Sequence, residues 1–353
     1  MASKRLMHRL VARGLLLATL TLVCFSEILI YHINEWSWKQ IYCRQENCTR
    51  ILFVADPQLL GKTFDTSWYS ALARNDADRY LKKTFEHASA FTKPDIVCFM
   101  GDLLDEGNIA SPQLYSTYVR RFKNIFHANQ NVQRIHIPGD NDIGGENGDY
   151  ISNSNIRRFE IEFMYQDLFD YDNRLRFFKI NRMVMDFTNP DRDNNMDRTR
   201  IGLSHMPLLM SGGPLLRNVL SDIDPHVMFS AHWHESRIFL YPSTNSIHFY
   251  QNEIRTFDLN ELKNEHTYLE IMIPTSSYRM GKPRMGYGFA VLENNMLYYT
   301  VLWGNNRFIC LIIYVIWTVC AITIYILVNM MTRCPFRVAK RHTQHRYCTI
   351  PQF

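Results

Sequence analysis

The sequence predicts an α/β domain held between two membrane-spanning helices. Three apolar runs of strand length, Ile51–Ala55, Ile96–Met100 and Arg134–Ile137, each end in carboxylate or carboxamide residues, and segments with helical periodicity separate them. Strands that alternate with helices predict an α/β fold. Two further apolar segments, one near each end of the 353-residue chain, have the length that a bilayer requires.

The composition is that of a folded membrane-anchored protein. Hydrophobic residues make up 46% of the chain and aromatic residues 13%, which permits a sizeable core and makes a folded domain the default. The formal net charge is +5, and much of the basic excess lies near the two termini, beside the apolar segments. These charges therefore indicate membrane topology rather than nucleic-acid binding.

The first apolar segment, Gly14–Tyr31, is interrupted only by Glu27 and follows several basic residues. A cleaved signal peptide is the alternative, but no small-residue cleavage site follows and the run is long for one. Glu27 either lies at the membrane interface or pairs with a polar neighbour. We expect a cytoplasmic N-terminus over residues 1–13 and a transmembrane helix over residues 14–32.

The second apolar segment, Phe308–Val328, contains no charged residue and is followed by basic residues. By the positive-inside rule both termini are cytoplasmic and residues 33–306 are lumenal or extracellular. We expect a second transmembrane helix over 307–330 and a basic cytoplasmic tail over 331–353. The glycosylation sequon at Asn47 agrees with this topology. Two buried helices of a soluble protein are the alternative.

Between the apolar segments we expect one domain. Helices are predicted over 67–91, 157–169 and 215–220. Another predicted helix begins at Pro112, and Ser111 is its N-cap residue. The second half of the domain is rich in predicted strands, and Asn294-Asn295 marks a hairpin turn between the last two. These strands are expected at 177–180, 183–187, 238–241, 247–250, 267–273, 289–293 and 296–302.

The eight cysteines are too few and too scattered for a disulfide framework. Cys43 and Cys48 form the one plausible pair, because they would close a small loop. Their pairing requires an oxidising compartment and is left open by the sequence.

Polar residues follow each of the first three predicted strands. Asp56 and Gln58 follow the first strand, Asp102 follows the second, and Asp140 and Asn141 follow the third. A rigid sheet fixes side chains that project from strand ends, so these groups can converge on one point. Their oxygen atoms suit a hard or borderline divalent metal ion.

Histidines follow two predicted strands in the second half of the chain. His205 comes after Ile201–Ser204, and His232 and His234 come after Val227–Ser230. One such histidine is most often a satisfied loop residue. Two histidines spaced by one residue are different, since strand alternation would place them on one face. Together with the strand-end carboxylates they predict a metal centre.

The order of these motifs resembles a known family. D-P-Q, G-D, G-D-N-D, H-M-P and A-H-W-H, over about residues 50–290, resemble the motifs of the calcineurin-like metallophosphoesterase superfamily. G-D-L-L-D-E-G, D-N-D-I-G, C-F-S-E-I-L-I-Y and I-P-T-S-S-Y-R-M-G-K-P, with a transmembrane helix at each end, are similar to the metallophosphoesterase 1 family, also called post-GPI-attachment-to-proteins factor 5. The resemblance implies a four-layer αββα sandwich.

The resemblance also implies a function. It implies a membrane-anchored two-metal phosphoesterase of the early secretory pathway, in the endoplasmic reticulum, its exit sites or the Golgi. The implied reaction removes the ethanolamine phosphate side branch from a mannose of GPI anchors and so promotes transport of GPI-anchored proteins. The implied partners are a GPI-anchored protein or glycolipid as substrate and the membrane, without nucleic acid.

By the same resemblance, two divalent metal ions share one set of ligands. Mn²⁺ is the metal it implies, and Fe and Zn²⁺ also accept these residue types. Asp102 would bridge the two ions. The other implied ligands are Asp56, Gln58 and His234 for the first ion, and Asp140, His205 and His232 for the second.

Three positions depart from the commonest superfamily pattern. Gln58 stands where that pattern has a ligand histidine, Asp140 where it has asparagine, and Asn141 where it has the catalytic histidine. Asparagine can hydrogen-bond a phosphoryl oxygen but cannot donate a proton as a general acid. The alternative to a slow enzyme is therefore a metal-binding lumenal recognition protein with little or no turnover.

Other polar residues have open roles. Asp142 is expected to orient its neighbours rather than bind metal. Asp105 and Glu106 either hold a ligand histidine or belong to a solvated loop. Tyr278 and Lys282 are either at the rim of an anionic substrate site or in an ordinary exposed loop.

Overall fold

The computed structural model describes residues 2–333, apart from 46, 65, 128–130, 146–148, 189–197, 211, 244–245 and 250–252. The chain divides into two compact units, one formed by Met1–Ser26 with Ile309–Phe353 and the other by Glu27–Phe308. Most of the predicted tail, from residue 334 on, lies outside the described residues.

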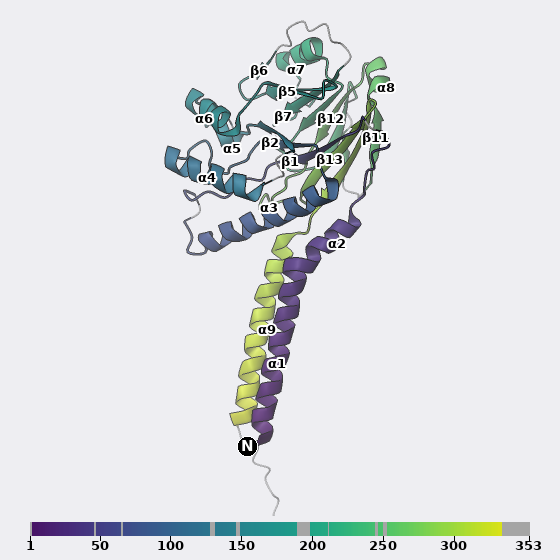
Figure 1. Ribbon diagram of the computed structural model, residues 1–353. Coiled ribbons are helices and arrows are strands. Elements are labelled where there is room, and N and C mark those ends of the chain that lie inside the picture. Colours follow the sequence, from purple (N-terminus) through teal and green to yellow (C-terminus); the bar gives the residue numbers. More distant parts are fainter. Residues whose placement is uncertain are drawn as a thin grey trace, which may run out of the picture. The chain divides into compact units, whose positions relative to one another are not determined.

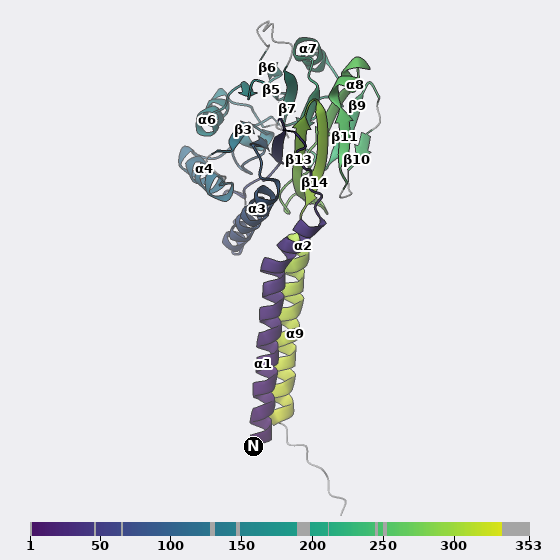
Figure 2. The same ribbon diagram turned by 45° about the vertical axis from the view of Figure 1, so that its right-hand side comes forward.

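The first unit is a pair of apolar helices. Helix α1, Ala2–Cys24, and helix α9, Arg307–Arg333, lie side by side in both views (Figures 1 and 2). His8 Nε2 lies 2.7 Å from Thr332 Oγ1, and Trp317 Nε1 donates to Thr19 Oγ1 at 2.9 Å. Helical segments Arg5–Ser37 and Arg307–Thr332 are long and apolar enough to cross a membrane.

The second unit begins with a π-helical turn, Phe25–Leu29, which continues as helix α2, Ile30–Ser37. Glu27 of this turn forms ion pairs with Arg79 and, at 2.7 Å, with Arg307. The buried Arg307 also pairs with Asp76 at 2.6 Å. Of the two alternatives for Glu27, the structure thus shows pairing with polar neighbours.

Two β-sheets form the centre of the second unit. The six-stranded sheet has the order β11-β14-β13-β1-β2-β3, in which β1, β2 and β3 are parallel to one another. Its strands are β1 Thr49–Val54, β2 Ile96–Met100, β3 Gln133–Ile137, β11 Arg255–Asp258, β13 Gly286–Glu293 and β14 Met296–Trp303.

The eight-stranded sheet has the order β10-β9-β12-β8-β7-β5-β4, with β6 paired to β5. Strands β5, β7, β8 and β12 are parallel neighbours. The strands are β4 Leu168–Tyr171, β5 Leu175–Asn181, β6 Asp186–Phe187, β7 Thr199–Ser204, β8 Val227–Ser230, β9 Arg237–Tyr241, β10 Ser246–His248 and β12 Tyr268–Met272.

Helices cover the outer faces of both sheets (Figure 2). Ser111 caps α4 as expected, because its side chain accepts from the backbone N–H of Leu114. The helices are α3 Ser70–Thr92, α4 Pro112–Ile125, α5 Asp140–Ile143, α6 Asn153–Phe163, α7 Pro214–Asn218, which continues as a π-helical turn to Ile223, and α8 Leu259–Asn264.

Strand alternation divides the core into layers. In β1, Ile51 and Phe53 face the second sheet, where Phe53 packs 4.2 Å from Phe229 between ring centroids. Leu52 and Val54 point the other way, into the core beneath α3, α4 and α6. A third cluster packs α7 on the outer face of the eight-stranded sheet. These layers confirm the four-layer αββα sandwich.

The structure corrects some expected elements. The helix expected over 157–169 ends at Phe163, because Met164 adopts a left-handed conformation with φ of 47°. Leu168–Tyr171 instead forms a strand that pairs antiparallel with β5. Strand β11 and helix α8 were not expected at all. The Asn294-Asn295 turn is confirmed, with φ of 50° and 64°.

The structure contains the disulfide between Cys43 and Cys48 that the sequence left open. It closes a small loop before β1, and this loop contains the sequon residue Asn47. The other described cysteines, Cys24, Cys98, Cys310 and Cys320, form no disulfide.

Glu106 holds the loop that follows β1. Its carboxylate, which is 1% exposed, accepts hydrogen bonds from the backbone N–H groups of Lys62, Thr63 and Phe64 at 2.8–3.0 Å. Tyr118 also donates to it, at 3.0 Å. Burial raises the pKa of Glu106, but these hydrogen bonds outweigh burial and hold it below the usual range. Glu106 is thus neither a partner of a ligand histidine nor a solvated loop residue.

We predict that Glu106→Gln lowers stability. The amide has one acceptor atom in place of two, so backbone N–H donors of the 62–64 loop lose their partner inside the protein, at a cost of about 1–3 kcal/mol. The midpoint of thermal unfolding should fall by roughly 2–4 °C for each kcal/mol. Because the pKa of the carboxyl is lowered by folding, the difference between wild type and variant should shrink as the pH falls through that pKa.

The matched control is Glu162→Gln, in an exposed pair with Lys123 at 3.5 Å. Exposed pairs contribute little, so this variant should stay within about 0.5 kcal/mol of wild type. Equal midpoints for Glu106→Gln and the control would contradict the anchoring role.

Candidate metal centre

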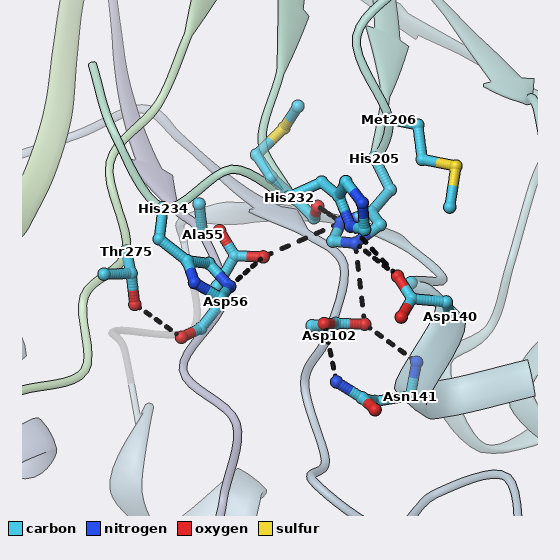
Figure 3. A network of polar contacts seen from close by, with 12 residues as sticks. Ala55, Asp56, Asp102, Asp140, Asn141, His205, Met206, His232, His234 and Thr275 are labelled. Atoms are coloured by element: carbon cyan, nitrogen blue, oxygen red, sulfur yellow. Dashed lines mark hydrogen bonds and ion pairs between the residues drawn. The ribbon is translucent and has the colours of Figure 1, made fainter. Parts of the chain in front are cut away.

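The predicted site residues meet where strands of both sheets end (Figure 3). Strands β1, β2 and β3 deliver the carboxylates, and β7 and β8 of the other sheet deliver the imidazoles. Parallel strands of one sheet share an edge at their carboxyl ends, which is why residues far apart in sequence come together. The convergent side chains are Asp56, Gln58, Asp102, Asp140, Asn141, His205, His232 and His234.

His205 lies at the middle of the cluster. Its Nε2 is 3.1 Å from Asp140 Oδ1 and 3.5 Å from Asp102 Oδ1, and its Nδ1 is 3.9 Å from Asp56 Oδ1. Nδ1 also lies 2.8 Å from the carbonyl oxygen of Met100, at the end of β2. Donation from Nδ1–H to that carbonyl directs Nε2 at the carboxylates, an arrangement typical of metal-binding histidines.

His232 and His234 reach opposite sides of the cluster. His232 Nδ1 lies 3.2 Å from Asp140 Oδ1, whereas His234 Nε2 lies 3.8 Å from Asp56 Oδ1. The side chains of both are partly exposed, at 16% and 21%, while the carboxylates are buried. The histidines therefore form the solvent side of the centre.

Two amides hold Asp102 in place. Gln58 Nε2 donates to Asp102 Oδ2 at 2.9 Å, and Asn141 Nδ2 donates to the same oxygen at 2.8 Å. The backbone N–H of Asn141 donates to Oδ1 at 3.0 Å. Gln58 Nε2 also lies 3.5 Å from His234 Nε2. Gln58 and Asn141 thus contact the carboxylate that the sequence places at the middle of the site.

Asp56 is a buried carboxylate that its surroundings do not satisfy. It is 0% exposed, and by strict geometry neither carboxylate oxygen accepts a hydrogen bond from the described residues. Burial raises its pKa well above the usual range, and neighbouring Asp102 and Asp140 raise it further, while His205 and the backbone N–H of His232 only partly offset them. A cation bound beside this carboxylate would stabilise its ionised form.

The neighbouring groups respond to the same crowding in different ways. Burial raises the pKa of Asp102, as it does that of Asp56. Burial lowers the pKa of His205, but Asp102, Asp140 and Asp56 outweigh it and raise that pKa to about 10, so without a cation this imidazole is charged. Burial opposes ionisation of Asp140 too, but His205 and His232 outweigh it and hold its pKa low. Burial lowers the pKa of His234 to about 4, so this imidazole is neutral at pH 7, the form that binds metal. Two sets of donors, Asp140-His205-His232 and Asp56-Asp102-His205, are close enough to hold an ion.

The backbone at the centre is strained. Five of the predicted site residues are non-glycine residues in the left-handed region, a conformation that costs of order 1–3 kcal/mol each. Such strain persists where the surrounding structure requires it, and it concentrates at functional sites. These residues are Asp56 (φ 45°), Gln58 (φ 38°), Asp102 (φ 51°), His232 (φ 71°) and His234 (φ 61°).

Two glycines leave room for the ligands. A Cβ at Gly139 would lie 2.1 Å from Asp102 Oδ1, and one at Gly101, whose φ is 90°, would lie 2.5 Å from His205 Nδ1. A side chain at either position would displace a predicted ligand. The glycines of the G-D and G-D-N-D motifs are therefore part of the site.

Asp142 orients the site, as expected. Its carboxylate accepts from the backbone N–H groups of Gly139 at 2.9 Å, Leu103 at 3.1 Å and Leu104 at 3.0 Å. It thereby fixes the end of β2 against the start of α5. No sequence pattern identified Leu103 and Leu104 as its partners.

The other candidates lie away from the centre or have different roles. Tyr278 is 2% exposed and donates to Asp76 at 2.8 Å, so both its expected rim position and its exposed-loop alternative are wrong. Lys282 pairs with Glu235 at 2.6 Å. His136 stacks on Phe99 in the core at 4.8 Å between ring centroids, and burial lowers its pKa to about 3.

Comparison with known proteins agrees with this geometry. Residues 49–236, more than half of the chain, match the model of the calcineurin-like phosphoesterase family. Metallophosphoesterase 1 of Cricetulus griseus is 27% identical over 188 residues, covering 51% of this chain and 46% of that protein. The Xenopus laevis protein of the same name is 32% identical over 40% of this chain and 37% of its own length. A Drosophila melanogaster homologue is 26% identical over 44% of this chain and 41% of its own. The matches thus span under half the length of each relative.

We predict that Asp56→Asn and Asp142→Asn have opposite effects on stability and on metal response. Asp56→Asn should leave the midpoint of thermal unfolding in chelator at or above that of wild type, because without a cation the buried carboxylate is destabilising. It should abolish most of the rise that Mn²⁺ causes, which is about 2.7 kcal/mol at a concentration 100 times Kd.

Asp142→Asn is the matched comparison. Its amide nitrogen would face a backbone N–H donor, so the midpoint in chelator should fall while the rise caused by Mn²⁺ persists. An unchanged Mn²⁺ response in Asp56→Asn would show that Asp56 binds no metal.

Proposed function

Because the chain belongs to the calcineurin-like phosphoesterase family, we propose that it is a membrane-anchored, metal-dependent phosphoesterase. The observation that supports this best is the buried carboxylate of Asp56, which the described residues leave unsatisfied beside two more carboxylates and three imidazoles. Two divalent ions, when bound, neutralise charge on a phosphoryl group and make a hydroxide nucleophile available from water at neutral pH.

The proposed ligand sets follow the two sides of the cluster. Asp56, Gln58 and His234 lie on one side, and Asp140, His205 and His232 on the other. Asp102 contacts both sides, at 2.9 Å from Gln58 and 3.5 Å from His205, which supports a bridging role. We propose Mn²⁺ as the metal, as the resemblance to the metallophosphoesterase 1 family implies. Fe and Zn²⁺ are the alternatives.

Asn141 is the proposed phosphate contact. Its Nδ2 donates a hydrogen bond to the Asp102 carboxylate. The amide is therefore next to the position where a phosphoryl group would contact the metals. It can donate a hydrogen bond to a phosphoryl oxygen but has no proton to give to a leaving group. His136 cannot replace it, because this imidazole packs against Phe99 and Phe163 and is neutral.

We propose a membrane-held phosphodiester as substrate, namely the ethanolamine phosphate branch on a mannose of a GPI anchor. The two apolar helices support this, because they would hold the centre near the membrane and raise its effective concentration toward a membrane-anchored glycan. The proposed topology is that residues 33–306 are lumenal, in the endoplasmic reticulum, its exit sites or the Golgi. Removal of the branch would promote export of GPI-anchored proteins.

We predict that Asp102→Asn abolishes turnover. Full-length protein in detergent, loaded with Mn²⁺, would be assayed with bis(p-nitrophenyl) phosphate and with a mannoside that carries ethanolamine phosphate. Loss of the charge between the two ligand sets should reduce kcat by at least roughly 10²-fold. Glu162→Gln, remote and exposed, should keep the wild-type rate.

The same assay separates the enzyme from its alternative. A recognition protein is favoured by the presence of Asn141, because asparagine cannot donate a proton to the leaving group. Wild-type protein that binds Mn²⁺ and the glycan but turns over neither substrate would overturn the enzyme and support recognition.

We predict that Asn141→His accelerates hydrolysis in a way that depends on the leaving group. A general acid contributes typically 10²–10⁴-fold where the leaving alkoxide needs a proton. The mannoside should therefore gain, whereas the nitrophenyl ester, which leaves as a stable phenolate, should change little. Asn141→Ala is the matched control and should slow both substrates, because it removes the hydrogen bond to the phosphate and the one that holds Asp102. An equal gain for both substrates would contradict a missing acid.

A further inference from the structure

A second group of side chains of the types that bind metal lies outside the centre, where α2 packs on α3 (Figure 1). His32 and Glu35 stand one turn apart on α2, and His87 stands on α3. Their donor atoms all lie within 4.8 Å of one another. These residues share no contact with the strand ends and belong to none of the motifs on which the proposed function rests.

Both imidazoles turn toward one carboxylate oxygen. His87 Nδ1 lies 3.0 Å and His32 Nδ1 lies 3.9 Å from Glu35 Oε2. A hydrogen bond between His87 and Glu35 would explain the 3.0 Å contact. It does not explain the position of His32, whose ring meets the His87 ring edge-on at 4.8 Å between centroids. The Nδ1 atom of His32 also points toward Glu35 Oε2.

The separations fit a tetrahedral ion. Zn²⁺ binds imidazole nitrogen and carboxylate oxygen at about 2.0–2.2 Å, which places neighbouring ligand atoms about 3.3 Å apart. The observed 3.0 and 3.9 Å bracket that value, so small side-chain movements complete the geometry. Two histidines and one glutamate form a donor set that holds zinc in other proteins, with water in the fourth position.

The surroundings support the ligand positions. His87 stacks on Tyr31, with ring centroids 5.9 Å apart and an interplanar angle of 16°. Lys83, one turn before His87, donates to the carbonyl oxygen of Glu27 at 2.7 Å, so its ammonium has another partner. The side chains of Glu35 and His87 are 33% and 23% exposed, which leaves an ion a path from solvent.

We propose that His32, Glu35 and His87 form a zinc site that ties α2 to α3. A donor set of two imidazoles and one carboxylate favours Zn²⁺ over the Mn²⁺ proposed for the main centre, because Mn²⁺ prefers more oxygen ligands. An ion that joins residues of two helices stabilises their packing, since binding energy is gained only when the helices are in contact.

The test is the metal content of full-length protein in detergent, saturated with Zn²⁺ and freed of excess metal by gel filtration. Wild type should retain one more Zn²⁺ per chain than His87→Asn or His32→Asn. His87→Asn keeps an N–H donor toward Glu35, so a purely structural hydrogen bond would survive it. In a Co²⁺ titration, the variants should lack one tetrahedral component of the visible spectrum.

Affinity and controls complete the test. Removal of a ligand should weaken the affected Zn²⁺ by more than the roughly 10–100-fold that loss of a supporting hydrogen bond costs. His127→Asn, at an exposed histidine, is the matched control and should retain the wild-type content. Equal zinc content and Co²⁺ spectra in wild type and His87→Asn would overturn the site. Failure of the phosphoesterase assays would leave this result unaffected, because the two sites share no ligand.

Discussion

The structure depends on the burial of three carboxylates at one point. Asp56, Asp102 and Asp140 lie around a single imidazole, that of His205, and repel one another in a medium where charges interact strongly. Burial and the neighbouring carboxylates raise the pKa of Asp56 and of Asp102, so the folded chain disfavours their ionised forms. Cations bound at this point would offset the repulsion between the carboxylates. The same cations would neutralise the phosphoryl group during hydrolysis of a phosphate ester. The three buried carboxylates therefore both destabilise the metal-free fold and provide the proposed metal ligands.

The fold meets this constraint by fixing the backbone around the carboxylates. The Met100 carbonyl sets the direction of the His205 ring, Asp142 binds three backbone N–H groups between β2 and α5, and Gly139 leaves space for Asp102. The left-handed conformations at the strand ends are maintained because the parallel strands beneath them are fully buried and paired on both sides. A sandwich of two sheets allows oxygen ligands to come from one sheet and nitrogen ligands from the other, which one sheet edge alone would not provide.

The sequence predicted the layers of the fold and the convergence of the site, because apolar runs that end in polar residues are local signals. It was less informative where the partner is distant in sequence. Glu106 and Tyr278 were each expected either beside the site or in an exposed loop, yet the first holds the 62–64 loop and the second binds Asp76, 202 residues away. Strand alternation was the expected reason for His232 and His234 to share a face. Their side chains converge instead because both residues adopt left-handed conformations after β8 ends. Short strands such as β11 carry too few residues for a periodic signal.

The segment that follows β12 connects the centre to the ends of the two apolar helices within the second unit. Thr275 Oγ1 donates to the backbone carbonyl of Asp56 at 2.8 Å, and Ser276 binds the carbonyl of Ala55. Three residues later Tyr278 donates to Asp76, which pairs with the buried Arg307 at the start of α9. Arg307 also pairs with Glu27, where the first helix enters the unit. A buried arginine with two carboxylate partners resists displacement, because loss of either partner leaves a charge uncompensated. The backbone of Asp56 and the start of α9 are thus fixed by one short segment, so the position of the proposed metal centre is determined by the same contacts that determine where the chain leaves the domain.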